Sequence, residues 1–369
     1  MSIAVYALPT KKLYDLKLEQ IISPTNQQAT FPFTCQLCDQ TLVIDQTLVM
    51  DQLLTDQSII NQSIISQSPT EQLLTHSEKA QNNLLELVVF SDLTMNVFQQ
   101  LLAKTNITLH AINAINHRNN AISYRFNVTT NNLETSRQQL AQLSITQGFE
   151  AALIYKAPKL SQPGVLVMDM DSTTIEIECI DEIAVLAGVG KQVAEVTELA
   201  MQGKLDFAQS LHQRVATLKN APEQVLSDVA KNIPLMPGLQ TLIRQLKQHH
   251  WHVAVASGGF TYFAEHLQQF LGLDAVFANK LEIVEGKLTG KVLGDVVDAQ
   301  AKADSLNLLS KKYKVPFEQT LAMGDGANDL VMMEAANLGI AFHAKPIVLS
   351  QADSAINHQG LDCALHWLG

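Results

Sequence analysis

Apolar residues between positions 84 and 157 recur with two different spacings. Short, mostly apolar or alternating runs typical of strands are interleaved with stretches in which apolar residues recur at helical spacing. The expected strands are Leu84–Phe90, Ile107–Asn116, Ile122–Thr129 and Phe149–Tyr155, and the expected helices are Asp92–Ala103 and Leu133–Leu143. The middle strands are joined by the polar turn His117–Asn120. This β-α-β-β-α-β order predicts a ferredoxin-like α+β domain.

The C-terminal half has a different pattern. Four apolar, strand-like runs alternate with helical stretches, which predicts an α/β fold with a doubly wound parallel sheet. The runs are 165–169, 252–256, 320–324 and 338–342. A helical insert at about 179–235 separates the first two runs, and Phe277–Val292 is expected to form a β-hairpin, with a turn at Glu285–Lys287.

The N-terminal segment 1–83 shows neither of these periodic patterns. It is Gln-rich at 41–75, where Gln recurs every five or six residues, a period that suits neither helix nor strand. Two interpretations stay open, a partly disordered insertion and an irregular layer packed on the next domain, and the many Leu and Ile residues favour the second. Two prolines mark a linker at 158–164. The expected domains are therefore 1–83, 84–157 and 165–369.

Composition narrows the classes of function. The 369 residues are 47% apolar and 17% charged, which suits two or three globular domains. No apolar run reaches the ~18–20 residues that span a membrane, and no secretory apolar region follows Lys11 and Lys12, so a cytoplasmic location is expected. The net charge of −11 argues against a nucleic-acid partner. A phosphate site would have to be locally positive.

The cysteines suggest no metal site. Cys35 and Cys38 form a C-x-x-C pair, but no second pair accompanies them to complete four zinc ligands. We interpret them as reduced thiols, and Cys179 as a small core residue.

Carboxylates and glycines mark the chemistry. Asp169-Met170-Asp171-Ser172-Thr173 follows the apolar run 165–168, so two carboxylates enter one site at a strand end. Such a pair can hold a divalent cation and can supply a nucleophile. Three further pieces follow in order: Ser257-Gly258-Gly259, Lys302 and Gly324–Asp329.

This order of motifs resembles the haloacid dehalogenase superfamily of phosphohydrolases, and residues 165–345 resemble the phosphoserine phosphatases. The segments Glu176–Ala184 and Met201–Phe207, followed by Arg214, carry the more specific likeness. The resemblance implies a haloacid dehalogenase-like fold with the insert as a helical cap. It also implies hydrolysis of O-phospho-L-serine through an aspartyl-phosphate, the last step of serine biosynthesis.

The resemblance assigns roles to the motif residues. Asp169 would be the nucleophile and a metal ligand, and Asp171 the general acid–base, with its backbone carbonyl on the metal. Asp325 would be a metal ligand, supported by Asp329. Because the ligands are few and all oxygen, Mg²⁺ is the expected cofactor.

The remaining roles concern phosphate and substrate. Ser257, Gly258 and Lys302 would bind the phosphoryl group, and Asn328 would support its binding. In the cap, Glu178 would meet the substrate ammonium and Arg214 its carboxylate, while Met201 and Phe207 would contact substrate or exclude water. Without the resemblance, the two charged residues would be ordinary helix surface, and Met201 and Phe207 ordinary core.

The domain at 84–157 resembles an ACT-type regulatory domain by pattern alone. Its turn at Ser91-Asp92-Leu93 lacks the Gly of many ligand-binding ACT domains, so amino-acid binding and a dimerising or packing role stay open, and a homodimer is one expected assembly. Two rival functions remain: a related phosphatase for another small phosphomonoester, and a non-catalytic amino-acid sensor. A P-type ATPase shares similar motifs but needs spanning segments.

Overall fold

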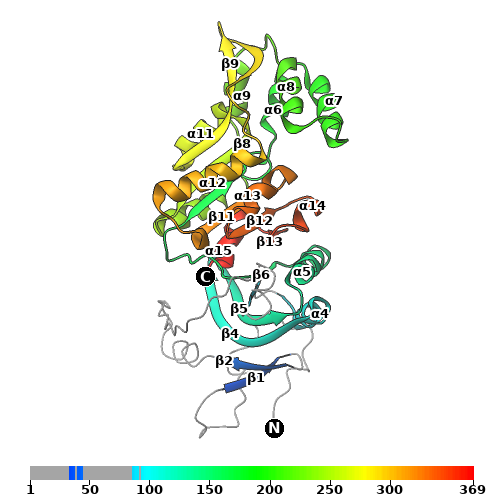
Figure 1. Ribbon diagram of the computed structural model, residues 1–369, viewed down its shortest axis with the longest axis vertical. Coiled ribbons are helices and arrows are strands. Elements are labelled where there is room, and N and C mark those ends of the chain that lie inside the picture. The colour runs from blue at the N-terminus through cyan, green and yellow to red at the C-terminus, as the bar shows by residue number, and fades with distance from the viewer. Residues whose placement is uncertain (1–32, 38–39, 45–84, 91–92) are drawn as a thin grey trace, which may run out of the picture. The chain divides into compact units, whose positions relative to one another are not determined.

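The computed structural model describes residues 33–37, 40–44, 85–90 and 93–369 (Figure 1). The chain divides into two compact units, Met1–Lys156 and Ala157–Gly369. Of the segment 1–83, two short strands are described, β1 (Phe33–Leu37) and β2 (Gln40–Ile44). Cys38 and most of the Gln-rich stretch lie outside the described residues, as does the turn residue Ser91.

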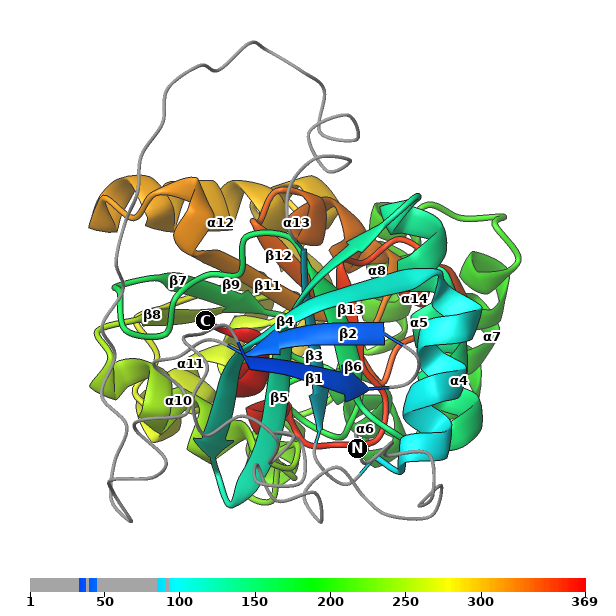
Figure 2. The same ribbon diagram turned by 90° about the horizontal axis from the view of Figure 1, so that it is seen from below.

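The described residues of the N-terminal unit form a six-stranded sheet with the order β1-β2-β4-β5-β3-β6. Its elements after β2 follow the β-α-β-β-α-β order and are β3 (Leu85–Phe90), α4 (Met95–Thr105), β4 (Ile107–Arg118), β5 (Ala121–Thr130), α5 (Leu133–Gln147) and β6 (Ala151–Ile154). β3 pairs antiparallel with both β5 and β6, and β2 lies beside β4 in parallel register (Figure 2). An ACT-type role for this unit stays a prediction.

The hairpin between β4 and β5 is tighter than expected. His117 and Arg118 belong to β4, and only Asn119 and Asn120 form the turn. Both asparagines have positive φ, 49° and 61°, which Asn tolerates better than most residues and which a two-residue hairpin turn requires. The strand therefore extends two residues past the expected end.

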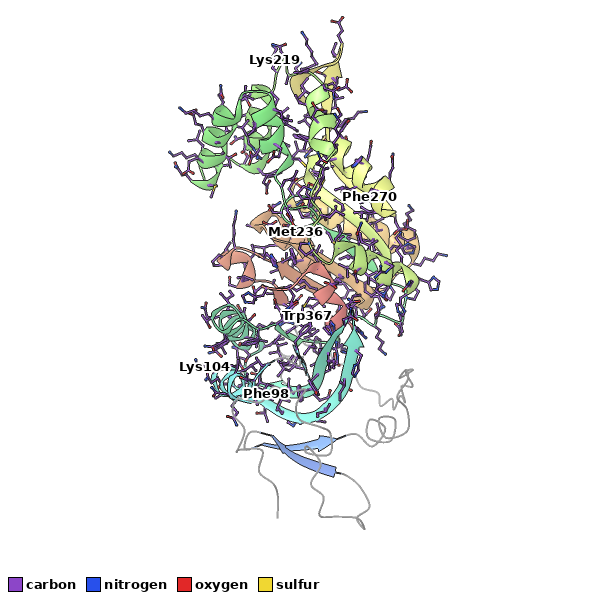
Figure 3. All side chains as sticks on the ribbon, turned by 180° about the vertical axis from the view of Figure 1, so that it is seen from behind. Phe98, Lys104, Lys219, Met236, Phe270 and Trp367 are labelled. Atoms are coloured by element: carbon purple, nitrogen blue, oxygen red, sulfur yellow. The ribbon has the colours of Figure 1, made fainter. Side chains whose placement is uncertain are left out.

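One apolar layer joins the two helices to this sheet. Phe98 of α4 is fully buried and stacks at a tilt on Phe126 of β5, with ring centroids 5.5 Å apart (Figure 3). Leu140 and Leu143 of α5 belong to the same buried cluster. Amphipathic helices packed on one face of the sheet thus give this unit its own core.

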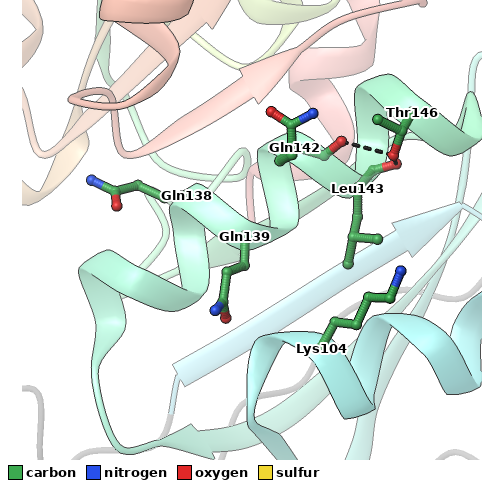
Figure 4. Close-up of a pocket in the computed structure, with 6 residues that line it drawn as sticks. All are labelled: Lys104, Gln138, Gln139, Gln142, Leu143 and Thr146. Atoms are coloured by element: carbon green, nitrogen blue, oxygen red, sulfur yellow. Dashed lines mark hydrogen bonds between the residues drawn. The ribbon is translucent and has the colours of Figure 1, made fainter.

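A pocket of about 630 Å³ opens between α4 and α5 (Figure 4). Its lining consists of Lys104, Gln138, Gln139, Gln142, Leu143 and Thr146. The Thr146 hydroxyl donates to the Gln142 carbonyl at 3.0 Å along one side of it. None of the site residues expected from the sequence lines this pocket.

The C-terminal unit is built on a seven-stranded sheet with the order β10-β9-β8-β7-β11-β12-β13. All neighbouring pairs are parallel except β10 with β9. The strands are β7 (Val165–Met168), β8 (His252–Phe260), β9 (Ala275–Val284), β10 (Lys287–Leu293), β11 (Thr320–Gly324), β12 (Leu338–Phe342) and β13 (Ser354–Ile356). The predicted parallel α/β sheet is confirmed. β8 runs four residues past its expected end, through a register irregularity between Ala256 and Phe260.

Helices cover this sheet because its central strands are apolar on both faces. All four residues of β7 are buried, as are all five of β11. The helices outside the cap are α10 (Leu239–Gln248), α11 (Thr261–Leu271), α12 (Ala299–Tyr313), α13 (Leu330–Glu334), α14 (Pro346–Leu349) and α15 (Ala364–Trp367). Short 3-10 turns lie at Phe317–Gln319, Ala327–Asp329 and Leu361–Cys363.

The insert between β7 and β8 is helical, as expected. It contains α6 (Cys179–Leu186), α7 (Gly190–Met201), α8 (Phe207–Thr217) and α9 (Gln224–Ala230). α8 begins with a capping box, in which Asp206 accepts from the Gln209 N–H at 2.8 Å and the Gln209 side chain accepts from Asp206 N–H. This fixes the residue at which α8 begins, and hence which side chains of α8 share a face.

The proline-containing segment before β7 is bound to its own unit at three points. Leu160 N–H donates to the Gly369 carbonyl, and Gly369 N–H donates to the Pro158 carbonyl, at 2.9 and 2.8 Å. The buried Gln319 amide accepts from Lys159 N–H at 2.7 Å and donates back to its carbonyl at 3.0 Å. Trp251 Nε1 donates to Leu160. The C-terminus therefore closes onto the start of the unit.

Across the described part of the chain, every helix is too short or too polar to cross a lipid bilayer.

Candidate active site

Asp169 stands at the carboxyl end of β7. Its backbone N–H donates to the Met323 carbonyl at 3.0 Å, so it continues the pairing of β7 with β11. The chain then turns sharply: N–H groups of Thr173, Thr174 and Ile175 all donate to the Met170 carbonyl. This loop leaves the Asp169 carboxylate buried, 6% exposed, at the edge of the sheet where parallel strands place their ligands.

Lys302 is the counter-ion of this carboxylate. Its Nζ lies 2.8 Å from Asp169 Oδ1 and 2.7 Å from Asp329 Oδ1. Lys302 is only 1% exposed, so it is not the solvated residue that a lysine on a polar helix would ordinarily be. Burial alone would lower the pKa of Lys302, but the attraction of the two carboxylates outweighs it and raises the pKa. The two carboxylates therefore favour the charged form of Lys302.

Three carboxylates converge beside this lysine. One oxygen atom each from Asp169, Asp325 and Asp329 lies within 4.8 Å of the others. Burial raises the pKa of Asp325, and the nearby Asp169 raises it further. Burial and Asp169 also raise the pKa of Asp329, to about 7, against the opposing effect of Lys302. Such crowding of like charges with one lysine leaves negative charge to be neutralised.

The donor set fits a hard divalent cation, because every available atom is oxygen. Asp329 is the least free of the three: Oδ1 accepts from Lys302 and Oδ2 from Gly326 N–H at 3.0 Å. Asp325 keeps one oxygen outside its bond from the Thr173 hydroxyl at 3.3 Å. The cluster Asp169, Asp325 and Asp329 could therefore bind a metal ion.

Asp171 lies two residues beyond Asp169 in a different environment. Its Oδ1 accepts from the N–H of Cys179, the first residue of α6, at 3.2 Å. Burial, with repulsion from Glu178 and Asp169, raises the pKa of Asp171 to about 8. These surroundings favour the protonated form of Asp171, whereas Asp169 is paired with a lysine.

The Ser257-Gly258-Gly259 segment closes the site from β8. Gly259 N–H donates to Ser257 Oγ at 2.8 Å. A Cβ on Gly259 would lie 2.8 Å from Asp171 Oδ2 and 3.1 Å from Ser257 Oγ, so only glycine fits between these groups. Gly258 meets the cap instead, since a Cβ there would lie 2.4 Å from Phe207 Cζ.

Asn279 supports this segment and was missed by sequence reasoning. It is 1% exposed; its Nδ2 donates to the Gly258 carbonyl at 2.8 Å, and its Oδ1 accepts from Val297 N–H at 2.9 Å. The side chain thus ties the glycine segment to the residues that lead into α12, which carries Lys302. A polar residue within an apolar strand was the available signal, but no motif included it.

The cap contributes two charged residues near Asp171. Glu178 precedes α6 and accepts from the Ser172 hydroxyl at 2.8 Å, and burial raises the pKa of its carboxyl. Arg214 on α8 is half-buried, which lowers the pKa of its guanidinium, while Asp181, Glu178 and Asp171 attract it. Arg214 differs from an ordinary surface arginine in one respect: its Nε is buried without a hydrogen-bond partner among the described residues.

Two further residues that were expected in the site make fewer contacts with it. Met201, the last residue of α7, is 71% exposed, so it is neither ordinary core nor packed against the site. Asn328 lies in the turn Ala327–Asp329 beside the acidic cluster, and its Oδ1 overlies Gly326.

Known proteins are similar to this chain in sequence and in fold. A family model described as haloacid dehalogenase-like hydrolase matches residues 164–337. Phosphoserine phosphatases of Vibrio cholerae serotype O1 and Haemophilus influenzae are 60% and 56% identical, each over 57% of this chain. A crystal structure of a probable phosphoserine phosphatase from Vibrio cholerae, unliganded, has a TM-score of 0.66 and 47% identity, covering 77% of this chain and 86% of that one. The chain belongs to the phosphoserine phosphatase family.

Membership confirms the haloacid dehalogenase-like α/β fold expected for the C-terminal unit. The matches span 64% and 67% of the two relatives' own lengths, about two thirds. All the motif residues that carry the family likeness lie in the C-terminal unit, Ala157–Gly369. The roles of individual side chains follow from the geometry around Asp169 and are argued below.

Proposed function

We propose that the protein hydrolyses O-phospho-L-serine to L-serine and phosphate through a phosphorylated Asp169. The observation that carries the proposal is the pair of carboxylates two residues apart in different surroundings. Asp169 is paired with Lys302 at 2.8 Å, and Asp171 has its pKa raised to about 8. One carboxylate is suited to attack and the other to give a proton.

In the first half-reaction, a carboxylate oxygen of Asp169 forms a bond to phosphorus while the bond from phosphorus to the serine oxygen breaks. Asp171 gives its proton to that oxygen, so serine leaves as a neutral alcohol. Lys302, the Ser257 hydroxyl and N–H groups of the glycine segment surround the phosphoryl oxygens and stabilise their charge. The buried setting of Asp169 keeps competing water away.

In the second half-reaction, Asp171 is a carboxylate and accepts a proton from water as that water attacks phosphorus. The bond between phosphorus and Asp169 breaks, phosphate leaves, and both carboxylates return to their starting states. One residue thus acts first as an acid and then as a base.

We propose Mg²⁺ as the cofactor, held by Asp169, Asp325 and the backbone carbonyl of Asp171. When bound, it would neutralise charge so that a carboxylate can approach a phosphate dianion. Asp329 is better suited to orient Lys302 and the Gly326 backbone than to bind the ion directly, because both of its oxygens are already occupied.

Substrate choice would come from the cap. Arg214 can grip a carboxylate with two parallel hydrogen bonds, and Glu178 can pair with an ammonium group, so together they match the two ends of an amino acid. Phe207, against Gly258, would exclude water over the phosphoryl group. Met201 has no such contact here, and Asn328 would support the phosphate side.

The test is phosphate release with Mg²⁺ across a panel of phosphomonoesters. We expect kcat/KM for O-phosphoserine to exceed that for phosphoethanolamine, which lacks the carboxylate, and for phospholactate, which lacks the amine. Equal rates on all three would favour a general phosphatase of the same superfamily. No turnover by a folded protein would favour the amino-acid sensor.

We further propose that the enzyme acts in the cytoplasm in serine biosynthesis, and that the N-terminal unit is an ACT-like domain that binds an amino acid or supports a homodimer.

A further inference from the structure

Two polar atoms of residues four positions apart on α8 are buried without a hydrogen-bond partner among the described residues. They are Ser210 Oγ and Arg214 Nε, and Ser210 is only 2% exposed. Buried polar groups in folded proteins are nearly always paired, so two unpaired atoms so close in sequence need a physical account.

The two atoms are complementary. Arg Nε carries a hydrogen and can only donate, whereas a serine hydroxyl oxygen can accept. Residues four apart lie one above the other on a helix face. Long helical side chains also lean toward the helix N-terminus, so Arg214 extends over the turn that contains Ser210.

The same direction leads to the proposed substrate site. Phe207, at the N-terminal end of α8, lies against Gly258 of the phosphate-binding segment. Asp181, Glu178 and Asp171 attract the Arg214 guanidinium electrostatically, with Asp181 the strongest. Phe207, Ser210 and Arg214 are spaced three and four residues apart on α8, so they share one face of the helix.

We propose that Ser210 is a positioning residue for Arg214. Its hydroxyl accepts a hydrogen bond from Nε–H when substrate binds, which fixes the plane of the guanidinium. The two terminal nitrogens are then left to grip the substrate carboxylate as a planar fork. Ser210 touches no reacting atom and acts through Arg214 alone, so this inference rests on the function proposed above.

The experiment uses the full-length protein with Mg²⁺ and two substrates, O-phosphoserine and phosphoethanolamine. For Ser210→Ala we expect kcat/KM on phosphoserine to fall about 3- to 30-fold, mainly through KM, with less than about a twofold change on phosphoethanolamine. The melting temperature should hold or rise, because alanine favours a helix and removes an unpaired hydroxyl. A merely structural role would lower it.

A double-mutant cycle gives the second measurement. In an Arg214→Ala background, Ser210→Ala should cause no further loss on phosphoserine. Val215→Ala, which removes buried bulk from the same helix, is the control and should affect both substrates alike. Equal losses on both substrates for Ser210→Ala, no loss on either, or an undiminished loss without Arg214 would each overturn the inference.

The two proposals fail in different ways. If the wild-type protein turns over no phosphoserine, the proposed function is wrong and this inference falls with it. If the wild type is active and selective but Ser210→Ala behaves like the wild type, only the role of Ser210 is wrong.

Discussion

The ring of Phe207 lies directly over Gly258, so close that a Cβ on the glycine would fall 2.4 Å from Cζ. Phe207 is the first residue of α8, the third cap helix. Gly258 belongs to the Ser257-Gly258-Gly259 segment of β8 and lies 51 residues further along the chain. The contact joins the cap to the catalytic core at the point where phosphate would bind. With the ring in this position, there is no room for a side chain at position 258.

Gly258→Ala should therefore impair catalysis more than folding. The added methyl must displace the Phe207 ring or the backbone that binds phosphate, and overpacking of this kind costs about 1–3 kcal/mol. We expect kcat/KM on phosphoserine to fall by roughly 5- to 150-fold. Gly190→Ala, where a Cβ meets nothing nearer than 3.4 Å, is the matched control and should change little. Wild-type kinetics of Gly258→Ala would mean that the ring moves freely.

Asp169→Asn should abolish turnover in a protein that still folds. The amide keeps the shape of the side chain but cannot attack phosphorus, and Lys302 retains its bond to Asp329 at 2.7 Å. We expect kcat to fall by at least about a thousandfold, measured by phosphate release, with a cooperative melt retained. The exposed Asp228→Asn on α9 serves as the control. Substantial activity in purified, folded Asp169→Asn would sink the mechanism.

Arg214→Ala should distinguish substrates rather than disable the enzyme. Loss of a charge-assisted contact is worth about 1.5–3 kcal/mol, or roughly ten- to a hundredfold in kcat/KM on phosphoserine. Phosphoethanolamine has no carboxylate and should be affected much less. Arg244→Ala, an exposed arginine on α10, is the control. Equal losses on both substrates would show that Arg214 acts on phosphate or on structure.

A protein that begins at Ala157 should keep the active site, because every catalytic candidate and the whole parallel sheet lie beyond that residue. We expect a similar kcat per folded site. A protein that begins at Val165 should melt earlier, since it loses the Lys159 partner of Gln319 and leaves that buried amide unpaired, at a cost of about 1–3 kcal/mol. Loss of activity in a cooperatively folded Ala157 protein would instead show that the N-terminal unit shapes the site.

The local pattern of apolar residues was enough to predict most strands of the C-terminal unit. The strands β7, β11 and β12 coincide with apolar runs to within a residue, because a strand buried on both faces has to be apolar throughout. Asp169 and Asp325 follow directly from those strand ends. Strands ran past their expected ends at two places: a glycine lets the backbone continue at Gly258 in β8, and asparagines permit a two-residue turn that begins at Asn119 after β4.

The sequence by itself determined the order of strands, helices and motifs, and with them the family, because these depend on residues close together in the chain. Only the tertiary structure decided that Lys302 is buried between Asp169 and Asp329, that Asn279 ties the glycine segment to the start of α12, and that Met201 is exposed. These contacts join residues up to 133 positions apart, counted from Asp169 to Lys302. They exist because a parallel sheet brings distant strand ends to one edge, and no local pattern records which side chains then meet.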